Sequence, residues 1–189
     1  MGAPRGALAV AFALLVAACS NGKLVGEPLP SQVAPDFTLT DGPTGQVVTL
    51  SSLHGQVVLL TFLYTRCPDA CPLTAETIRS ARDKLGDAAK SVAFVAVSVD
   101  PQGDTPATTR QFVRDHNLDG TLRYLIGPQA ALSRVWQMYS VAQAGSDAKV
   151  LHSDVIYLID KNSRGRVLFH SDVQPADLAN DLNLLVQGR

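Results

Sequence analysis

The sequence lacks the features that mark several large classes of protein. Its 16 Lys and Arg residues nearly balance its 17 Asp and Glu residues, and no basic run occurs. Because nucleic-acid-binding surfaces are strongly basic, we expect no nucleic-acid partner. The sequence also has no internal repeat and no low-complexity tract. With 189 residues, of which 46% are hydrophobic, the chain is long enough for one domain with a proper core and a tail.

Cysteine is scarce, and the first of the three cysteines follows a segment that is typical of an export signal. Arg5 precedes a nearly apolar stretch from Ala7 to Ala18, which is too short to span a bilayer as a helix. The end of this stretch, Val16 to Cys19, resembles the lipobox of bacterial lipoproteins, in which the signal is cut before a cysteine that receives the lipid. We therefore predict a signal peptide at residues 1–18 and lipidation of Cys19. The alternative is an ordinary signal peptide with an incidental cysteine.

Lipidation would also account for the odd number of cysteines, since acylation of Cys19 leaves Cys67 and Cys71 as a pair. Outside the cytoplasm this pair faces oxidation, so a Cys67–Cys71 disulfide is one expected resting state. Residues 20–34 are rich in Gly, Pro, Ser and Asn and have no periodicity. We predict that residues 19–34 form a lipidated tether and that residues 35–189 form one domain.

From Pro35 onward the sequence predicts alternating strands and helices. Two short segments on either side of residues 41–45 indicate a small hairpin at the start of the domain. The apolar runs Val57–Leu63 and Ser91–Val99 have the composition of buried parallel strands. Further strands are expected at residues 122–126, 155–159 and 167–169, and helices at residues 72–85, 105–116, 128–139 and 175–186. This order predicts a thioredoxin-like α/β fold, with a central mixed sheet flanked by helices on both faces and an N-terminal β-hairpin.

Both remaining cysteines lie in the segment that follows the first buried strand. Pro72 suits the first position of a helix, where its missing N–H costs nothing, which predicts Cys71 as the N-cap and Cys67 in the preceding loop. Both sulfurs would then lie near the positive end of a helix. That field favours the thiolate, which binds metals and attacks disulfides, whereas the charge of Asp69 opposes it. In an α/β fold this loop lies at the carboxyl edge of the sheet, where ligands bind.

Three interpretations of the cysteine pair compete. A thioredoxin-type oxidoreductase has two residues between its cysteines and a cis-proline before a later strand, but this chain has three residues in between and no proline from residue 129 to 174. A peroxiredoxin needs a threonine three residues before its reactive cysteine, where this chain has Tyr64 or Pro68. The third is a metal site, in which two thiolates converge on one ion together with at least one further ligand.

Among the four histidines, His152 is the strongest candidate for that further ligand. It lies just before a predicted core strand, at the place that the cis-proline occupies in thioredoxins, and in this fold that place faces the cysteine loop. His54, His116 and His170 are expected to be solvated surface residues. Asp100 ends the second buried strand at the same edge. It either orients a metal ligand through a hydrogen bond, or influences the pKa of the thiols, or is an ordinary strand-end or turn residue.

Four segments follow one another along the chain: Tyr64–Pro72 with its C-x-x-x-C spacing, Val97–Pro101, Asp104–Pro106, and His152-Ser153 leading to Tyr157–Asp160. In this combination and order they resemble the motifs of the Sco/SenC copper proteins. The similarity runs from about Pro35 to the C-terminus, and one departure is Arg66, where many members carry histidine.

The resemblance implies that Cys67, Cys71 and His152 bind one copper ion. The family helps to build the dinuclear copper site of cytochrome c oxidase, as a copper donor, as a thiol reductant, or as both. The implied partners are the copper-site subunit of the oxidase, another copper chaperone and a thioredoxin-like reductant. The implied location is the bacterial cell membrane, with a lipid anchor and the domain facing the periplasm.

The donor atoms agree with copper. Two thiolate sulfurs and one imidazole nitrogen suit Cu(I). The same three donors carry a charge of −2, which Cu(II) would neutralise. Zinc with an added water as fourth ligand is also compatible with this donor set. The leading prediction is a metallochaperone. The alternative is a thiol-disulfide reductase in which copper is incidental and His152 is not needed.

Overall fold

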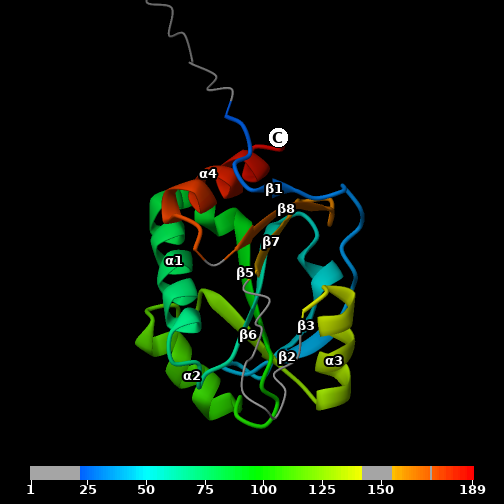
Figure 1. The fold of residues 1–189 in the computed structure, drawn as a ribbon, viewed down its shortest axis with the longest axis vertical. Helices are drawn as coiled ribbons and strands as arrows, with labels where there is room; N and C mark the ends of the chain where they lie inside the picture. Colours follow the sequence, from blue (N-terminus) through cyan, green and yellow to red (C-terminus); the bar gives the residue numbers. More distant parts are fainter. Residues whose placement is uncertain (1–21, 142–154, 171) are drawn as a thin grey trace, which may run out of the picture.

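The centre of the molecule is one mixed sheet, described here from a computed structural model of residues 22–141, 155–170 and 172–189. In this part of the chain its strands lie in the order β1-β8-β7-β4-β5-β6-β2-β3 (Figure 1). The strands are β1 Glu27–Pro28, β2 Thr38–Asp41, β3 Val47–Thr49, β4 Val57–Leu63, β5 Val92–Ser98, β6 Leu122–Ile126, β7 Val155–Ile159 and β8 Gly165–His170. The helices are α1 Ala70–Leu85, α2 Pro106–Asp115, α3 Gln129–Met138 and α4 Pro175–Val186, with the 3₁₀ helices η1 Leu50–Leu53 and η2 Gly86–Ser91.

The middle of the sheet is buried on both faces. β4 pairs with β5 in parallel and with β7 in antiparallel, and β5 pairs with β6 in parallel. Every residue of β4 and β5 is buried. Residues from α1, α2 and α4 pack on one face, and residues from η1 and α3 pack on the other. Helices on both faces explain why these two strands read as unbroken apolar runs rather than as alternating ones.

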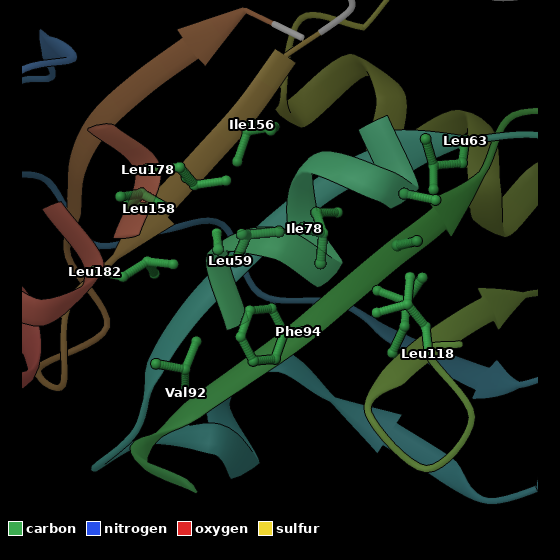
Figure 2. Close-up of a cluster of buried hydrophobic side chains, with 14 of the residues drawn as sticks. Leu59, Leu63, Ile78, Val92, Phe94, Leu118, Ile156, Leu158, Leu178 and Leu182 are labelled. Carbon is green, nitrogen blue, oxygen red and sulfur yellow. The ribbon is translucent and has the colours of Figure 1, made fainter. Parts of the chain in front are cut away.

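Figure 2 shows the larger of the two packed faces. Leu59 of β4 and Phe94 of β5 point toward Ile78 of α1, and Leu182 of α4 closes the same cluster. The observed mixed sheet with helices on both faces confirms the predicted arrangement. The predicted N-terminal hairpin is also confirmed, because β2 and β3 pair in antiparallel at the edge beside β6.

Local signals placed several helix ends correctly. Thr105 caps α2 through a reciprocal pair of hydrogen bonds with Thr108, and Pro106 occupies the first helical position. Gly86 ends α1 with a φ of 55°, a left-handed conformation that glycine adopts without steric cost. None of the helices in the described ranges combines the length and the apolar character that crossing a bilayer requires.

The described part of the segment predicted as a tether, residues 19–34, contacts the domain from Lys23 onward. β1 pairs with β8 at the edge of the sheet, and Val33 forms an isolated bridge with Arg164. The backbone N–H groups of Val25 and Gly26 donate to the buried carboxylate of Asp181 in α4, at 2.9 Å and 3.0 Å. A segment rich in Gly and Pro and without periodicity thus makes long-range hydrogen bonds with the domain.

We expect Asp181→Ala to release this segment. The substitution removes the acceptor for two backbone N–H groups, and leaving such groups unsatisfied costs about 1–3 kcal/mol. Urea unfolding should show this loss, and hydrogen exchange at Val25 and Gly26 should accelerate. The exposed Asp172, replaced by alanine, is the control and should change neither quantity. Unchanged exchange at Val25 and Gly26 in the Asp181 variant would show that β1 pairing alone holds the segment.

Candidate functional site

The two cysteines of the described residues lie at the carboxyl edge of the two central strands. β4 ends at Leu63, and the N–H of Val99, just after β5, donates to the Leu63 carbonyl at 2.9 Å. The chain then turns, with the N–H of Cys67 donating to the carbonyl of Tyr64 at 3.3 Å, and enters α1 at Ala70. The predicted placement of the loop at this edge of the sheet is therefore confirmed.

The start of α1 differs from the sequence prediction. The helix begins at Ala70 with Asp69 at the N-cap position, so Cys71 lies inside the first turn and is not the N-cap. The Asp69 side chain makes no capping hydrogen bond. Instead, the N–H of Cys71 donates to the sulfur of Cys67 at 3.2 Å. Pro72 is tolerated within the first turn because N–H groups there have no partner inside the helix, so its missing donor is not needed.

Both sulfur-bearing side chains are buried. Cys67 is 8% exposed and Cys71 is 4% exposed, and both belong to the apolar cluster that includes Leu63 and Ala75. No disulfide joins the two sulfurs in the structure. The Cys67 sulfur thus lies within hydrogen-bond distance of the Cys71 backbone, in surroundings from which water is largely excluded.

Tyr64 packs beside the cysteine pair and contacts the apolar clusters on both faces of the sheet. Burial raises the pKa of Tyr64 to about 12, and a hydrogen bond with Cys67 and electrostatic interactions with Cys67 and Cys71 act in the same direction. The phenol is therefore neutral at physiological pH. It supplies Cys67 with a polar neighbour without adding charge.

Asp100 lies beside the loop, where it holds the residue next to Cys67. Its carboxylate accepts hydrogen bonds from the Arg66 guanidinium at 2.7 Å and 3.1 Å and from the Gly103 N–H at 2.9 Å. Burial alone would raise the pKa of Asp100, but these hydrogen bonds outweigh it and leave the pKa below its ordinary value. Asp100 thus contacts the cysteine loop through Arg66.

Sequence reasoning assigned no role to Asp104, which the structure places directly beneath the loop. Its side chain is buried and accepts both the backbone N–H and the hydroxyl of Thr65, at 2.8 Å and 2.7 Å. The Asp-Thr-Pro sequence before a helix reads as a capping segment, and Thr105 does make that cap. No local signal distinguishes a buried aspartate at the preceding position from an exposed one.

The remaining predicted residues fall into two groups. His54 follows η1, His116 follows α2 and His170 ends β8, and no group of three or more His, Cys, Asp or Glu side chains suited to a metal occurs within the described ranges. His152 and Cys19 lie outside the described residues. A third His, Cys, Asp or Glu ligand at the cysteine pair would therefore come from beyond the described part of the chain.

Comparison with known proteins gives a consistent result. The family model SCO1/SenC matches residues 25–187. The SCO1 protein homolog of Bacillus subtilis is 28% identical over 169 residues, which cover 87% of this chain and 85% of that protein.

Solved structures agree in fold. The structure of Bradyrhizobium japonicum ScoI with copper bound superposes with a TM-score of 0.70 and 33% identity, covering 82% of this chain and 99% of that one. BsSco, described as a member of the Sco family of cytochrome c oxidase assembly proteins, superposes with a TM-score of 0.73 at 21% identity, covering 88% of this chain and 100% of that one. These superpositions confirm the thioredoxin-like α/β class.

Proposed function

This chain belongs to the SCO1/SenC family, and from that premise we propose that it binds one copper ion through Cys67, Cys71 and His152. We further propose that it is a metallochaperone, tethered to the membrane by a lipid on Cys19, that assists assembly of the dinuclear copper site of cytochrome c oxidase. The copper is cargo that the protein takes up and passes on.

The observation that carries this proposal is the arrangement of Cys67 and Cys71. One sulfur accepts the N–H of the residue that bears the other, at 3.2 Å, so the two thiols share one small region at the start of α1. Two such sulfurs form a soft donor pair, and soft donors select Cu(I) over the harder ions that oxygen ligands prefer. Burial in the apolar cluster keeps competing water away from them.

The donor set supports binding of either oxidation state. Two thiolates and a neutral imidazole carry a charge of −2, so the complex has a net charge of −1 with Cu(I) and is neutral with Cu(II). Neither state carries a large unbalanced charge into a buried site, where such a charge would be costly. This property suits a protein that must both accept and release the ion.

The attachment of the N-terminal segment supports a membrane-tethered role. The Lys23 carbonyl accepts a hydrogen bond from the side-chain amide of Asn180 in α4 at 3.2 Å. α4 and β1 lie at the end of the molecule remote from α2 (Figure 1). The cysteine loop lies beside α2. From Cys19 to Lys23 the chain spans at most about 14 Å, so a lipid on Cys19 would hold the α4 end near the membrane. The proposed copper site would then face outward.

A second candidate function is thiol-disulfide reduction of a partner's cysteines. The closeness of Cys67 to the Cys71 backbone favours it as much as it favours metal binding, because the same geometry allows a disulfide to form. The two functions differ in their need for His152.

Copper titration of the reduced and the oxidised protein tests the proposal. Because thiolates are the metal-binding form, we expect one tight equivalent of copper in the reduced protein and none in the form with a Cys67–Cys71 disulfide. A competing chelator reports Cu(I), and absorption with electron paramagnetic resonance reports Cu(II). Equal copper in both forms would refute the assignment of these two cysteines as ligands.

A further inference from the structure

The loop between β5 and α2 holds the two residues that precede Cys67. Thr65 donates its backbone N–H and its hydroxyl to one oxygen of Asp104, at 2.8 Å and 2.7 Å. The next residue, Arg66, donates to Asp100 at 2.7 Å. Both aspartates belong to the same tight loop, since the Asp104 N–H donates to the Asp100 carbonyl at 2.9 Å. Two consecutive residues of the cysteine loop are thus tied to one neighbouring loop.

Asp104 is the firmer of the two attachments. It is 4% exposed, and its second oxygen accepts the hydroxyls of Ser98 at 2.6 Å and Tyr124 at 3.2 Å. Ser98 and Tyr124 are themselves fully buried. Four donors therefore occupy the carboxylate, which leaves it no alternative partner and fixes its orientation. Burial raises the pKa of Asp104, although the hydrogen bonds from Ser98 and Thr65 oppose the rise.

The Arg66 attachment is weaker. Arg66 is 68% exposed at its side chain, and solvent screens an ion pair at such a site. The pair lies directly over Gly103, where an added Cβ would collide with the Asp100 carboxylate and with the Arg66 guanidinium. Glycine at this position thus permits the contact, but the contact itself remains at the surface.

We propose that Asp104 is a positioning residue for the Cys67 thiol: by holding Thr65, it fixes the loop so that the Cys67 sulfur meets the N–H of Cys71. The loop has two fixed points, Thr65 on Asp104 and the start of α1, and Cys67 lies between them. The part of this inference that concerns copper rests on the proposed function, whereas the part that concerns the thiols does not.

The test is the equilibrium between dithiol and disulfide. In the exchange, two protein thiols and one glutathione disulfide give the protein disulfide and two glutathione thiols. Its equilibrium constant measures how well the two sulfurs are placed for each other, because fixed geometry raises their effective concentration. For Asp104→Ala we expect the constant to fall about tenfold, which corresponds to about 30 mV in the midpoint potential of this two-electron couple. Cu(I) affinity should fall by about tenfold as well, as for other residues that orient metal ligands.

Asp104→Asn separates position from charge. The amide oxygen can still accept both donors of Thr65, and the amide N–H₂ can donate to the hydroxyl oxygens of Ser98 and Tyr124. We therefore expect this variant to restore most of the thiol–disulfide constant. If it is as impaired as Asp104→Ala, the effect comes from the negative charge, and the positioning role is wrong.

Asp181→Ala is the matched control, because it removes another buried carboxylate that accepts two backbone N–H groups, at the other end of the molecule. It should lower the free energy of unfolding and leave the thiol–disulfide constant unchanged. If Asp104→Ala behaves like this control, Asp104 is only structural and the proposal falls. If Asp104→Ala does not fold, Thr65→Val takes its place, since it removes one of the two bonds to Asp104. It should shift the constant in the same direction by a smaller factor, and an unchanged constant would refute the proposal.

If the unchanged protein binds no copper, the proposed function is refuted. The thiol–disulfide exchange with glutathione would still decide the role of Asp104. Arg66→Ala compares the contribution of the Arg66–Asp100 ion pair with that of Asp104. Because its ion pair with Asp100 is exposed, we expect a smaller change in the thiol–disulfide constant than for Asp104→Ala. A larger change would assign the positioning role to Asp100 and Arg66 instead.

Discussion

Replacement of both Cys67 and Cys71 by serine is expected to abolish stoichiometric copper binding. A neutral hydroxyl is a hard and weak donor, so the variant would offer Cu(I) no soft ligand at this site. We expect the affinity to fall by at least about a thousandfold, which corresponds to about 4 kcal/mol. Titration of the protein from Gly22 onward with Cu(I), in competition with a chelator, measures the loss. The sulfur-to-copper charge-transfer absorption of the Cu(II) form should disappear in the same variant.

The fold should survive this double substitution. A serine at position 67 can still accept the backbone N–H of residue 71, since its hydroxyl replaces the sulfur as the acceptor at the start of α1. Far-ultraviolet circular dichroism and the urea midpoint therefore serve as controls for folding. A well-folded variant that still binds one tight equivalent of copper would place the metal elsewhere and refute the assigned ligands.

His152→Ala is expected to separate copper carriage from thiol reduction. Loss of the proposed nitrogen donor leaves only two sulfurs, and we expect the affinity for copper to fall by about a hundredfold or more, given the dependence of metal affinity on the full ligand set. The exchange of the Cys67–Cys71 pair with glutathione involves sulfur alone. Its equilibrium constant should therefore remain close to that of the unchanged protein. Chelator competition and the glutathione assay measure the two quantities on the same sample.

His54 offers a matched control, because it is an exposed histidine that follows η1. His54→Ala should alter neither copper affinity nor the thiol–disulfide constant. If His152→Ala also leaves the copper affinity unchanged, His152 is not a ligand, and the reductase becomes the better account of the pair. If it abolishes the glutathione exchange instead, the histidine acts in the thiol chemistry.

Much of the fold could be predicted from the sequence because its signals are local. The apolar run Val57–Leu63 is β4 as expected, and the helix predicted at Pro175 is α4 with the same bounds. Thr105 and Pro106 marked the start of α2 through capping chemistry that involves only neighbouring residues. The cysteine spacing and the place of the loop at the carboxyl edge of the sheet likewise follow from the order of strands and helices.

The tertiary structure decided the features that depend on partners far along the chain. The sequence could not indicate that Asp181 anchors Val25, from which it is separated by 156 positions, or that Asp104 holds Thr65, at 39 positions. The sequence predicted that α1 starts at Pro72, two residues later than the observed start at Ala70. The acceptor of the Cys71 N–H is the Cys67 sulfur in the preceding loop, which the sequence did not indicate.

The sequence by itself therefore determined the strand and helix order and the cysteine pair, because apolar periodicity, helix caps and residue spacing are properties of neighbouring positions, and its motifs carried the resemblance to the family. Only the tertiary structure decided which carboxylates are buried and which backbone N–H groups they accept. A buried carboxylate must be satisfied by whatever donors the fold brings to it, and the sequence near Asp104 and Asp181 does not specify those donors.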